Sequence, residues 1–495
     1  MAESQYQKIV TRCREIALYK SASGVLGWDQ ETYMPKKGLA YRAEQLAFLG
    51  GKSHRLFTDP EVGGWLAAAE DAGEAEGTSL EAANLRAWRW SYDRATKLSA
   101  EFVEEQARTS ALAKGAWVEA REKSEFPLFQ PHLERSIELN RQKAEFYGYP
   151  TVRYDALLES YERGATTASV GALFAELKPQ LSEIGASAAR KSGALPAALL
   201  AGDYPVEEQT VFNRDVAEAF GFDFESGRID TTTHPFCTGL APGDTRLTTR
   251  YDTRDFSSSL YGVMHEAGHG LYEQGLPGEH FGTPAGSSAS LGIHESQSRL
   301  WENHVGRAPA FWEHWFPRAA AIFPSLADRS ASDLAAMAGR SEPGFIRVDA
   351  DEASYDLHVI LRFEMEKDLV SGELEAADVP SAWNSKFEEM FGLKVGKDSD
   401  GCLQDIHWSM GALGYFPTYT LGNLGAAQLF AKARAEKPEI DSELGAGRYG
   451  VLLAWMREKV HSKGAQLLPA ELIEAATGEP LSPKYHLEHL KARYL

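Results

Sequence analysis

The chain has 495 residues, 43% of them hydrophobic and 25% charged, which is ordinary for a globular protein with a large core. Its 51 basic and 71 acidic side chains give a formal net charge of −20, which argues against nucleic acid and against an anionic membrane as partners. No run of 18 apolar residues occurs, so we expect no membrane-spanning helix.

Cysteine usage and the N-terminus favour a cytoplasmic protein. The three cysteines, Cys13, Cys237 and Cys402, are too few and too scattered for a disulfide framework or a thiolate zinc site. Residues 1–5 are polar and lack the apolar stretch of a signal peptide. A soluble protein of the cytoplasm is therefore the expectation.

Residues 1–220 carry helical patterns almost throughout. Segments such as 99–123 and 131–147 are rich in Ala, Glu, Lys, Leu and Arg and show a 3.6-residue period. Clusters of Pro and Gly at 34–38, 147–150 and 201–205 separate the helical stretches. The sequence therefore predicts a mainly α fold for this part of the chain.

The pattern changes between residues 228 and 253. Residues 231–233 and 247–251 favour β-strands, and the turn-rich stretch 239–243 lies between them. We expect a hairpin or a small sheet here, directly before an amphipathic helix over 257–270.

After this helix the chain returns to helical patterns up to its C-terminus, apart from a loop over 281–291 that contains Gly, Ser and Pro. No stretch has the composition of a linker. We therefore expect a single domain over residues 1–495, built as two lobes.

Residues 265–269, with the sequence HEAGH, form the most informative motif of the chain. His265 and His269 are four residues apart, so one helical face carries both imidazoles and both can reach one metal ion. Glu266 stands beside that face, where its carboxylate can take a proton from water at the metal. Taken alone, the motif also fits a solvated helix that carries this pattern without function.

Two glycines and a downstream glutamate extend the motif. Gly268 and Gly270 each lower helix stability by roughly 1 kcal/mol relative to Ala, and we expect the close approach of a second segment at the metal to be the reason for them. A catalytic zinc needs a third protein ligand, which can be a Glu on a following helix. We select Glu295 as this ligand and expect its neighbour His294 to point elsewhere.

Six motifs occur along the chain in order. They are HPF at 234–236, DTRLT at 244–248, HEAGH at 265–269, HESQ at 294–297, IRVDAD at 346–351 and GCLQDIHW at 401–408. Two further segments, 28–35 and 415–419, resemble the same protein family as these motifs. Over nearly its whole length the chain therefore resembles the carboxypeptidase Taq family of thermostable zinc metallocarboxypeptidases, with no departure at the metal-binding positions.

The resemblance implies a mainly helical, two-lobed fold around a deep groove, like that of neurolysin-like and angiotensin-converting-enzyme-like peptidases, with the small β element beside the metal helix. It implies one zinc ion per chain, with cobalt or another divalent ion as the alternative, and a homodimer. It also implies an enzyme that releases single residues with broad specificity from peptides with a free C-terminus, and that handles a terminal proline poorly.

The family pattern places a carboxylate-binding arginine at Arg347. A guanidinium suits this role because it binds a terminal carboxylate through two parallel hydrogen bonds. The structural alternative is an ion pair with Asp349 or Asp351. We expect Asp351 to orient Arg347 rather than to contact substrate.

Three further side chains are candidates for stabilising negative charge during the reaction. We consider His407 as the group that polarises the scissile carbonyl or stabilises the oxyanion, the alternative being a buried histidine that donates to Gln404 or Asp405. Tyr415 and Tyr419 are candidates for a phenol donor to the tetrahedral intermediate.

The residues before the metal helix have two interpretations. His234 precedes the β segment and is a candidate for lining the groove, while Asp244, Arg246 and Thr248 alternate along a predicted strand and so face one side. They form either an edge that aligns the substrate backbone or a polar brace for the metal helix, and we favour the brace for Asp244 and Arg246. Metal-bound histidines also need acceptors for their second ring nitrogen, which Asp244 or Asp405 would supply.

The motifs together predict hydrolysis of the last peptide bond with Glu266 as the general base. An endo-oligopeptidase or a dipeptide-releasing carboxypeptidase with the same metal chemistry is the nearest alternative. A helical binding or scaffold protein with a vestigial metal site is the alternative from another class. Glu266 beside a complete ligand set argues against it.

Overall fold

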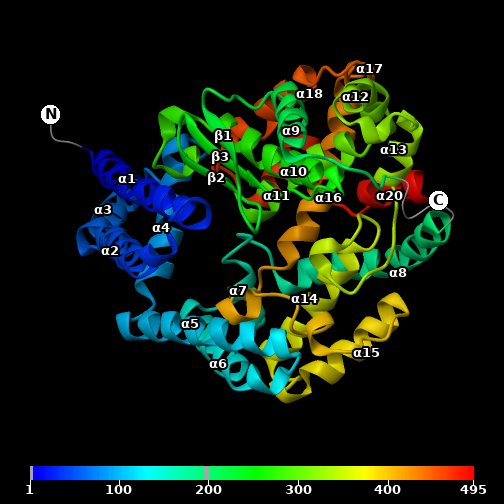
Figure 1. Cartoon of the computed structure of the whole chain (residues 1–495). Coiled ribbons are helices and arrows are strands. Elements are labelled where there is room, and N and C mark those ends of the chain that lie inside the picture. Colours follow the sequence, from blue (N-terminus) through cyan, green and yellow to red (C-terminus); the bar gives the residue numbers. More distant parts are fainter. Residues whose placement is uncertain (1–3, 194, 196–199) are drawn as a thin grey trace. The chain divides into compact units, whose positions relative to one another are not determined.

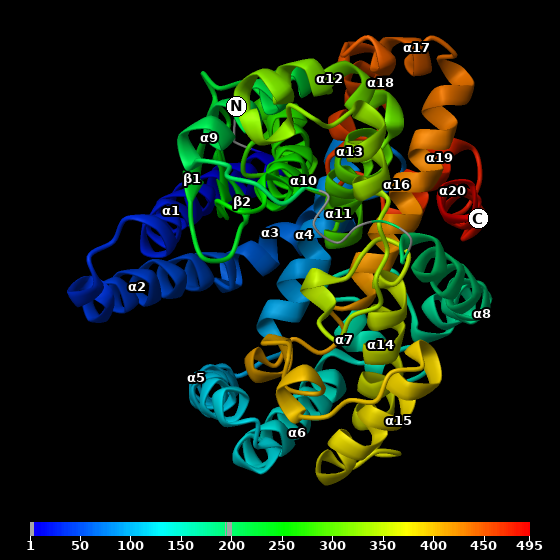
Figure 2. The same ribbon diagram turned by 45° about the vertical axis from the view of Figure 1, so that its right-hand side comes forward.

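The computed structural model describes residues 4–193, 195 and 200–495, and the chain divides into two compact units. Unit 1 comprises Met1–Thr96, Ala197–Ala338 and Gly425–Pro480, and unit 2 comprises Lys97–Pro196, Gly339–Leu424 and Leu481–Leu495. Both units are mainly helical, which confirms the predicted fold class (Figures 1 and 2). None of the helices in the described part of the chain has the length and hydropathy needed to cross a bilayer.

Unit 1 combines helices with one small sheet. Its helices are α1 (Gln5–Thr32), α2 (Leu39–Phe57), α3 (Pro60–Asp71), α4 (Leu80–Thr96), α9 (Val206–Phe220), α10 (Phe256–Gly275), α11 (Leu291–Arg299), α12 (Pro309–Ile322), α13 (Ala331–Ala338), α17 (Ile440–Gly445), α18 (Gly450–Lys459) and α19 (Pro469–Thr477). A π-helical segment, η5 (Leu300–Gly306), continues α11 without a break. Helix α16 (Pro417–Glu436) begins in unit 2 and ends in unit 1.

The sheet has three strands, β1 (Gly227–Thr231), β2 (Cys237–Ala241) and β3 (Asp244–Thr249), in the order β1-β3-β2. β3 pairs in parallel with β1 and antiparallel with β2. The predicted small sheet is therefore confirmed, but the prediction of a turn over 239–243 is wrong for residues 239–241, which belong to β2. A Cβ at Gly239 would lie 2.1 Å from a carboxylate oxygen of Glu273 on α10, so a larger residue in this strand would displace the Glu273 side chain.

Helix α10 lies at the centre of unit 1 and carries the HEAGH motif. Its first turn is capped by the Asp255 carboxylate, which accepts from the Ser257 backbone amide at 2.9 Å. It packs against α9, α11 and the strands β2 and β3, and the strands lie beside it in Figure 1. The side chains expected on its apolar face are all buried, namely Leu260, Val263, Met264, Ala267 and Leu271.

Close packing accounts for both glycines of this helix, but only at Gly268 does the contact come from a segment of the candidate metal site, as predicted. A Cβ at Gly268 would lie 2.6 Å from the Cα of Ser298 and 2.7 Å from the carbonyl oxygen of Gln297, so α11 touches the backbone of α10 at that point. A Cβ at Gly270 would lie 2.7 Å from the Phe222 ring. The absence of a side chain at position 268 therefore allows α11 to reach α10 beside the two histidines.

Unit 2 is a helical unit around its own core. Its helices are α5 (Ala100–Lys123), α6 (Gln130–Tyr147), α7 (Arg153–Leu158), α8 (Thr167–Ser192), α14 (Tyr355–Ser371), α15 (Val379–Phe391) and α20 (Lys484–Tyr494). The predicted helices over 99–123 and 131–147 agree with α5 and α6 to within one residue. Helix α14 packs against α6, α7, α8 and α15 and is buried along most of its length.

Replacing Gly268 by Ala is expected to destabilise unit 1 by about 1–3 kcal/mol, because the new methyl group overlaps the backbone of α11. Urea unfolding followed by circular dichroism measures this loss. Gly64→Ala in α3 is the matched control, because a Cβ there meets nothing within 4 Å. It should leave stability unchanged or raise it by up to about 1 kcal/mol. Equal stability of the two variants would contradict the close-contact argument.

Candidate active site

His265, His269 and Glu295 come together in unit 1 with one potential ligand atom each, and these three atoms lie within 4.8 Å of one another. The Glu295 Oε2 is 3.7 Å from His265 Nε2 and 3.5 Å from His269 Nε2. The α10 face supplies the two imidazoles, and α11 supplies the carboxylate. Ser290 caps α11 by accepting from the Ile293 amide at 3.0 Å, which sets where the helix begins.

The donor set fits a zinc ion. Ligands about 2.1 Å from a tetrahedral zinc lie about 3.4 Å from each other, close to the two separations measured from Glu295. Two imidazoles and one carboxylate also leave a fourth coordination position open, as catalytic zinc sites require. These three residues would therefore hold the divalent metal ion of a hydrolytic site.

The electrostatics keep Glu295 ionised and His269 neutral, the states in which both bind metal. Burial opposes ionisation of Glu295, but Arg299, whose Nε donates to it at 2.6 Å, and His265 hold the pKa of this carboxyl well below its usual range. Burial, together with His294 and His265, lowers the pKa of His269 to about 3. Ser298 also donates to Glu295, at 3.2 Å.

Glu302 is the hydrogen-bond partner of His265. Its Oε2 lies 3.0 Å from His265 Nδ1, which leaves Nε2 for the metal. Burial opposes ionisation of Glu302, but the bond to His265 and the positive charges of Arg299 and Arg307 lower its pKa to about 2. Glu302 lies in the π-helical segment η5, so this irregular turn delivers a carboxylate to the metal site.

His294 is the partner of His269, and Glu273 is in turn the partner of His294. His294 Nδ1 lies 2.6 Å from His269 Nδ1, and His294 Nε2 lies 2.7 Å from Glu273 Oε1. The group of potential metal ligands does not include His294, whose Nδ1 meets the His269 ring nitrogen opposite the one that faces Glu295, so His294 points away from the candidate metal position as predicted. Asp244 and Asp405 are not the acceptors of the metal-binding histidines, since each of them pairs with arginine.

Glu266 is 6% exposed and lies beside the metal-binding face of α10. Burial and the nearby charge of Glu295 raise its pKa to about 7, although His265 opposes the shift. A carboxyl group with this pKa can both accept and return a proton near neutral pH.

Arg347 is 5% exposed in unit 2, where the 3₁₀ turn η7 (Arg347–Asp349) begins. Its Nε donates to Asp405 at 3.0 Å, its Nη2 lies 2.9 Å from the same oxygen, and its Nη1 donates to Tyr355 at 2.8 Å. The expected role of Asp351 in orienting Arg347 is wrong. The Asp351 carboxylate instead accepts from Ser341 and from nearby backbone amides, and Asp405 holds the arginine.

Asp405 is shared by two arginines. Arg362, which is fully buried on α14, donates to its second oxygen at 2.6 Å. Burial opposes ionisation of Asp405, but Arg362 and Arg347 hold its pKa well below the usual range. The backbone amide of Arg347 donates to the side-chain carbonyl oxygen of Gln404 at 2.8 Å. Gln404 and Asp405 therefore both contact Arg347 directly.

His407 and the two tyrosines form one aromatic cluster. His407 Nε2 lies 3.3 Å from the Tyr419 hydroxyl, and the rings of His407 and Tyr415 are 5.1 Å apart. Burial, with Arg347 and Arg362, lowers the pKa of His407 to about 4, so the imidazole is neutral at neutral pH. Tyr419, rather than Gln404 or Asp405, is the hydrogen-bond partner of His407.

The polar contacts of Asp244, Arg246 and Thr248 lie within the sheet region and with α1, so the predicted brace for the metal helix stays a prediction. Arg246 makes two bonds to Asp244, at 2.8 and 2.9 Å, and its guanidinium lies 4.2 Å from the centre of the Trp28 ring. Thr248 exchanges hydrogen bonds with the backbone of Phe236. His234 is exposed in the connection between β1 and β2.

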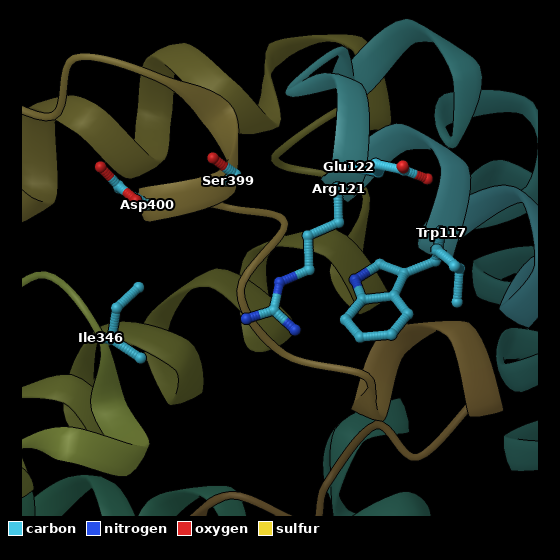
Figure 3. A pocket seen from close by; sticks show the side chains of 7 residues that line it. Trp117, Arg121, Glu122, Ile346, Ser399 and Asp400 are labelled. Atoms are coloured by element: carbon cyan, nitrogen blue, oxygen red, sulfur yellow. The ribbon is translucent and has the colours of Figure 1, made fainter.

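A pocket of about 500 Å³ opens on unit 2 beside the residue that precedes Arg347 (Figure 3). Its lining is Trp117, Val118, Arg121, Glu122, Ile346, Ser399 and Asp400. The Arg121 guanidinium lies 5.4 Å from the Trp117 ring, and the Trp117 indole donates to the Leu403 carbonyl oxygen at 2.9 Å. This contact anchors α5 to the chain just before Gln404.

Sequence reasoning missed Glu302, Glu273, Tyr355 and Arg362. Helical spacing contains a signal for the two glutamates, because Glu273 follows His269 by four residues and Glu302 follows Glu295 by two helical turns. No comparable signal exists for Tyr355 and Arg362, because their partners Arg347 and Asp405 lie in other segments.

The mainly helical fold, the His–His–Glu trio and the buried Glu266 define a metal-dependent hydrolase. A model of the carboxypeptidase Taq (M32) metallopeptidase family matches residues 8–494, so the chain belongs to that family and is a metallocarboxypeptidase. This finding confirms the family that the six motifs indicate.

Relatives match along the whole chain. Thermostable carboxypeptidase 1 of Thermus thermophilus is 42% identical over 99% of this chain and 98% of its own length. The crystal structure of an M32 carboxypeptidase from Deinococcus radiodurans is 37% identical, with a TM-score of 0.95 over 99% of this chain and 98% of that chain. Metallocarboxypeptidase 1 of Trypanosoma cruzi is 36% identical, with a TM-score of 0.95 over 99% of both chains.

Replacing Glu302 by Gln is expected to weaken metal retention by about 10–100-fold, because His265 loses its charged acceptor. Competition with a chelator at a defined free zinc concentration measures the effect. Glu313→Gln on α12 is the matched control, because Glu313 is exposed. Zinc affinities that are equal in the two variants would show that Glu302 does not tune His265.

Proposed function

We propose that this enzyme removes single residues from the C-termini of peptides, with broad specificity and poor handling of terminal proline. The observation that carries the proposal is the buried, pre-oriented Arg347. A guanidinium has five N–H groups, and the bonds to Asp405 and Tyr355 engage three of them, which leaves two for a carboxylate. This arrangement suits recognition of a free C-terminus through two parallel hydrogen bonds.

We propose zinc as the metal, one ion per chain, with cobalt as the alternative, held by His265, His269 and Glu295. When bound, the ion supplies Lewis acidity towards the peptide carbonyl and lowers the pKa of a coordinated water molecule. Glu266 acts as the general base, taking a proton from the attacking water and passing it to the departing amine. Its burial and its pKa of about 7 support this double role.

His407, Tyr419 and Tyr415 are proposed to stabilise the negative charge that develops on the carbonyl oxygen. The neutral imidazole of His407, 3.3 Å from the Tyr419 hydroxyl, supports a role as a hydrogen-bond donor rather than as a cation. His234 is proposed to contact substrate because it is exposed beside the sheet. Asp244, Arg246 and Thr248 are proposed to form a polar brace for the metal helix α10, which packs against their strand β3.

Three further properties belong to the proposal. Single-domain behaviour of residues 1–495 is proposed because the chain passes repeatedly from one unit to the other. A homodimer is supported by apolar side chains exposed on α1 and α2, where Leu18, Tyr41 and Phe48 are 66%, 77% and 67% exposed. A cytoplasmic location is supported by the free thiols of the three cysteines. Light scattering that gives the mass of one chain in solution would contradict the homodimer.

A time course of hydrolysis on a mixed pool of peptides tests the proposed function. Mass spectrometry should show products that shorten by one residue at a time from the C-terminus, and a chelator should stop the reaction. Steps of two residues would favour the dipeptide-releasing alternative, and internal cuts would favour an endo-oligopeptidase.

In the same assay Glu266→Gln should keep its metal but lose about 10²–10⁴-fold in turnover. Elemental analysis checks the metal content, and initial rates check the turnover.

Replacing Arg347 by Ala is expected to raise KM for peptides with a free C-terminus by about 100-fold, because two charge-assisted hydrogen bonds are lost. The measurement compares each peptide with its C-terminal amide in wild type and variant. Arg340→Ala is the control, because Arg340 pairs with the exposed Glu342. A variant that still prefers the free acid by the wild-type factor would refute the role of Arg347.

A further inference from the structure

The segment over residues 404–415 of unit 2 carries several of the proposed functional groups with little regular structure of its own. Its one helical turn is η10 (His407–Met410), and Gly411 and Gly414 follow with positive φ angles of 70° and 95°. Such a segment has no hydrogen-bond ladder to order it, so its geometry depends on contacts with neighbouring elements.

Helix α14 supplies these contacts through two side chains one turn apart. Arg362 and Glu366 are both fully buried on the same face of the helix. Arg362 donates to Asp405 at 2.6 Å and to the His358 carbonyl oxygen of its own helix at 2.6 Å. The first anchor therefore holds the beginning of the segment, and through Asp405 it also holds Arg347.

Glu366 holds the rest of the segment at both ends. Its Oε1 accepts from the Trp408 indole at 2.9 Å, next to His407. Its Oε2 accepts from the Gly414 amide at 2.8 Å, next to Tyr415. One carboxylate thus binds both Trp408 and Gly414. These two residues are the direct chain neighbours of His407 and Tyr415.

Further contacts hold the Glu366 carboxylate and residues 408–414 in place. The Tyr154 hydroxyl on α7 donates to the same Oε2 at 2.7 Å, so three donors converge on one buried group. Burial raises the pKa of Glu366 to about 7, and the three donors limit the rise. A Cβ at Gly414 would lie 2.7 Å from the Leu157 carbonyl carbon, so the segment also packs directly on the backbone of α7.

We propose that Glu366 is a positioning residue for the reaction: it sets the places of His407 and Tyr415, whereas Arg362, acting through Asp405, sets Arg347. This inference rests on the proposed function. It predicts that the two anchors of α14 act on different kinetic parameters. Groups that act only on developing charge affect kcat, whereas the carboxylate-binding arginine affects KM.

The test compares Glu366→Gln with Glu364→Gln. Glu364 lies on the same helix but pairs with Lys178 and Lys386, so it receives the same chemical change without touching the segment. Glu366→Gln should lower kcat by about 100-fold, as expected for misplaced reacting groups, with KM changed less than about threefold. Hydrogen exchange of peptides that cover residues 408–414 should become faster in this variant alone, with zinc content unchanged.

Arg362→Lys completes the comparison, because it should raise KM for free C-termini more than it lowers kcat.

Tyr154→Phe keeps the proposal testable if Glu366→Gln does not fold. This variant removes one donor to Glu366 and should lower kcat by a smaller factor. Equal kcat values for the Glu366 and Glu364 variants, or unchanged exchange of residues 408–414, would overturn the proposal. A wild-type chain that releases no residue would instead contradict the proposed function, and the exchange comparison would still decide the anchoring.

Discussion

The contact of α11 with the backbone of α10 at Gly268 is the constraint on which the metal site depends. The two histidines of α10 can face one ion by helical spacing alone, but the third ligand has to come from another helix. Only a position without a side chain lets the Ser298 backbone come this close. The same crossing brings His294 to His269 and Glu302 to His265, so one close approach assembles the ligands together with their hydrogen-bond partners.

The buried charged groups of unit 1 and those of unit 2 solve the same electrostatic problem in different ways. A buried ionised group is costly unless opposite charges and hydrogen bonds compensate it. In unit 1, Arg299 and Arg307 compensate the carboxylates of Glu295 and Glu302. In unit 2, the charges of two arginines converge on Asp405. The second arrangement leaves a net positive charge that suits a carboxylate ligand, whereas the first leaves acidic and imidazole groups that suit a metal cation.

In both units a buried helix fixes the position of a less regular segment that carries functional groups. A nearly fully buried helix carries polar side chains on one face, and a less regular segment is fastened to that face. In unit 1 the helix is α10, and η5 delivers Glu302 to it. In unit 2 the helix is α14, and Glu366 fastens residues 408–414. Rigid helices with fixed side chains define reacting geometries better than loops alone, since their backbones tolerate little displacement.

The sequence by itself predicted the mainly helical fold, the candidate metal-binding group of His265, His269 and Glu295, and the reason for Gly268, because helical spacing and ligand chemistry are local properties. It did not determine β2, since the local sequence around Gly239 favours a turn and only the pairing with β3 makes these residues a strand. It assigned the wrong partner to Arg347, because nothing along the chain distinguishes Asp351 from Asp405. Only tertiary packing decides which buried charges meet, since each pair joins segments whose approach depends on the whole core.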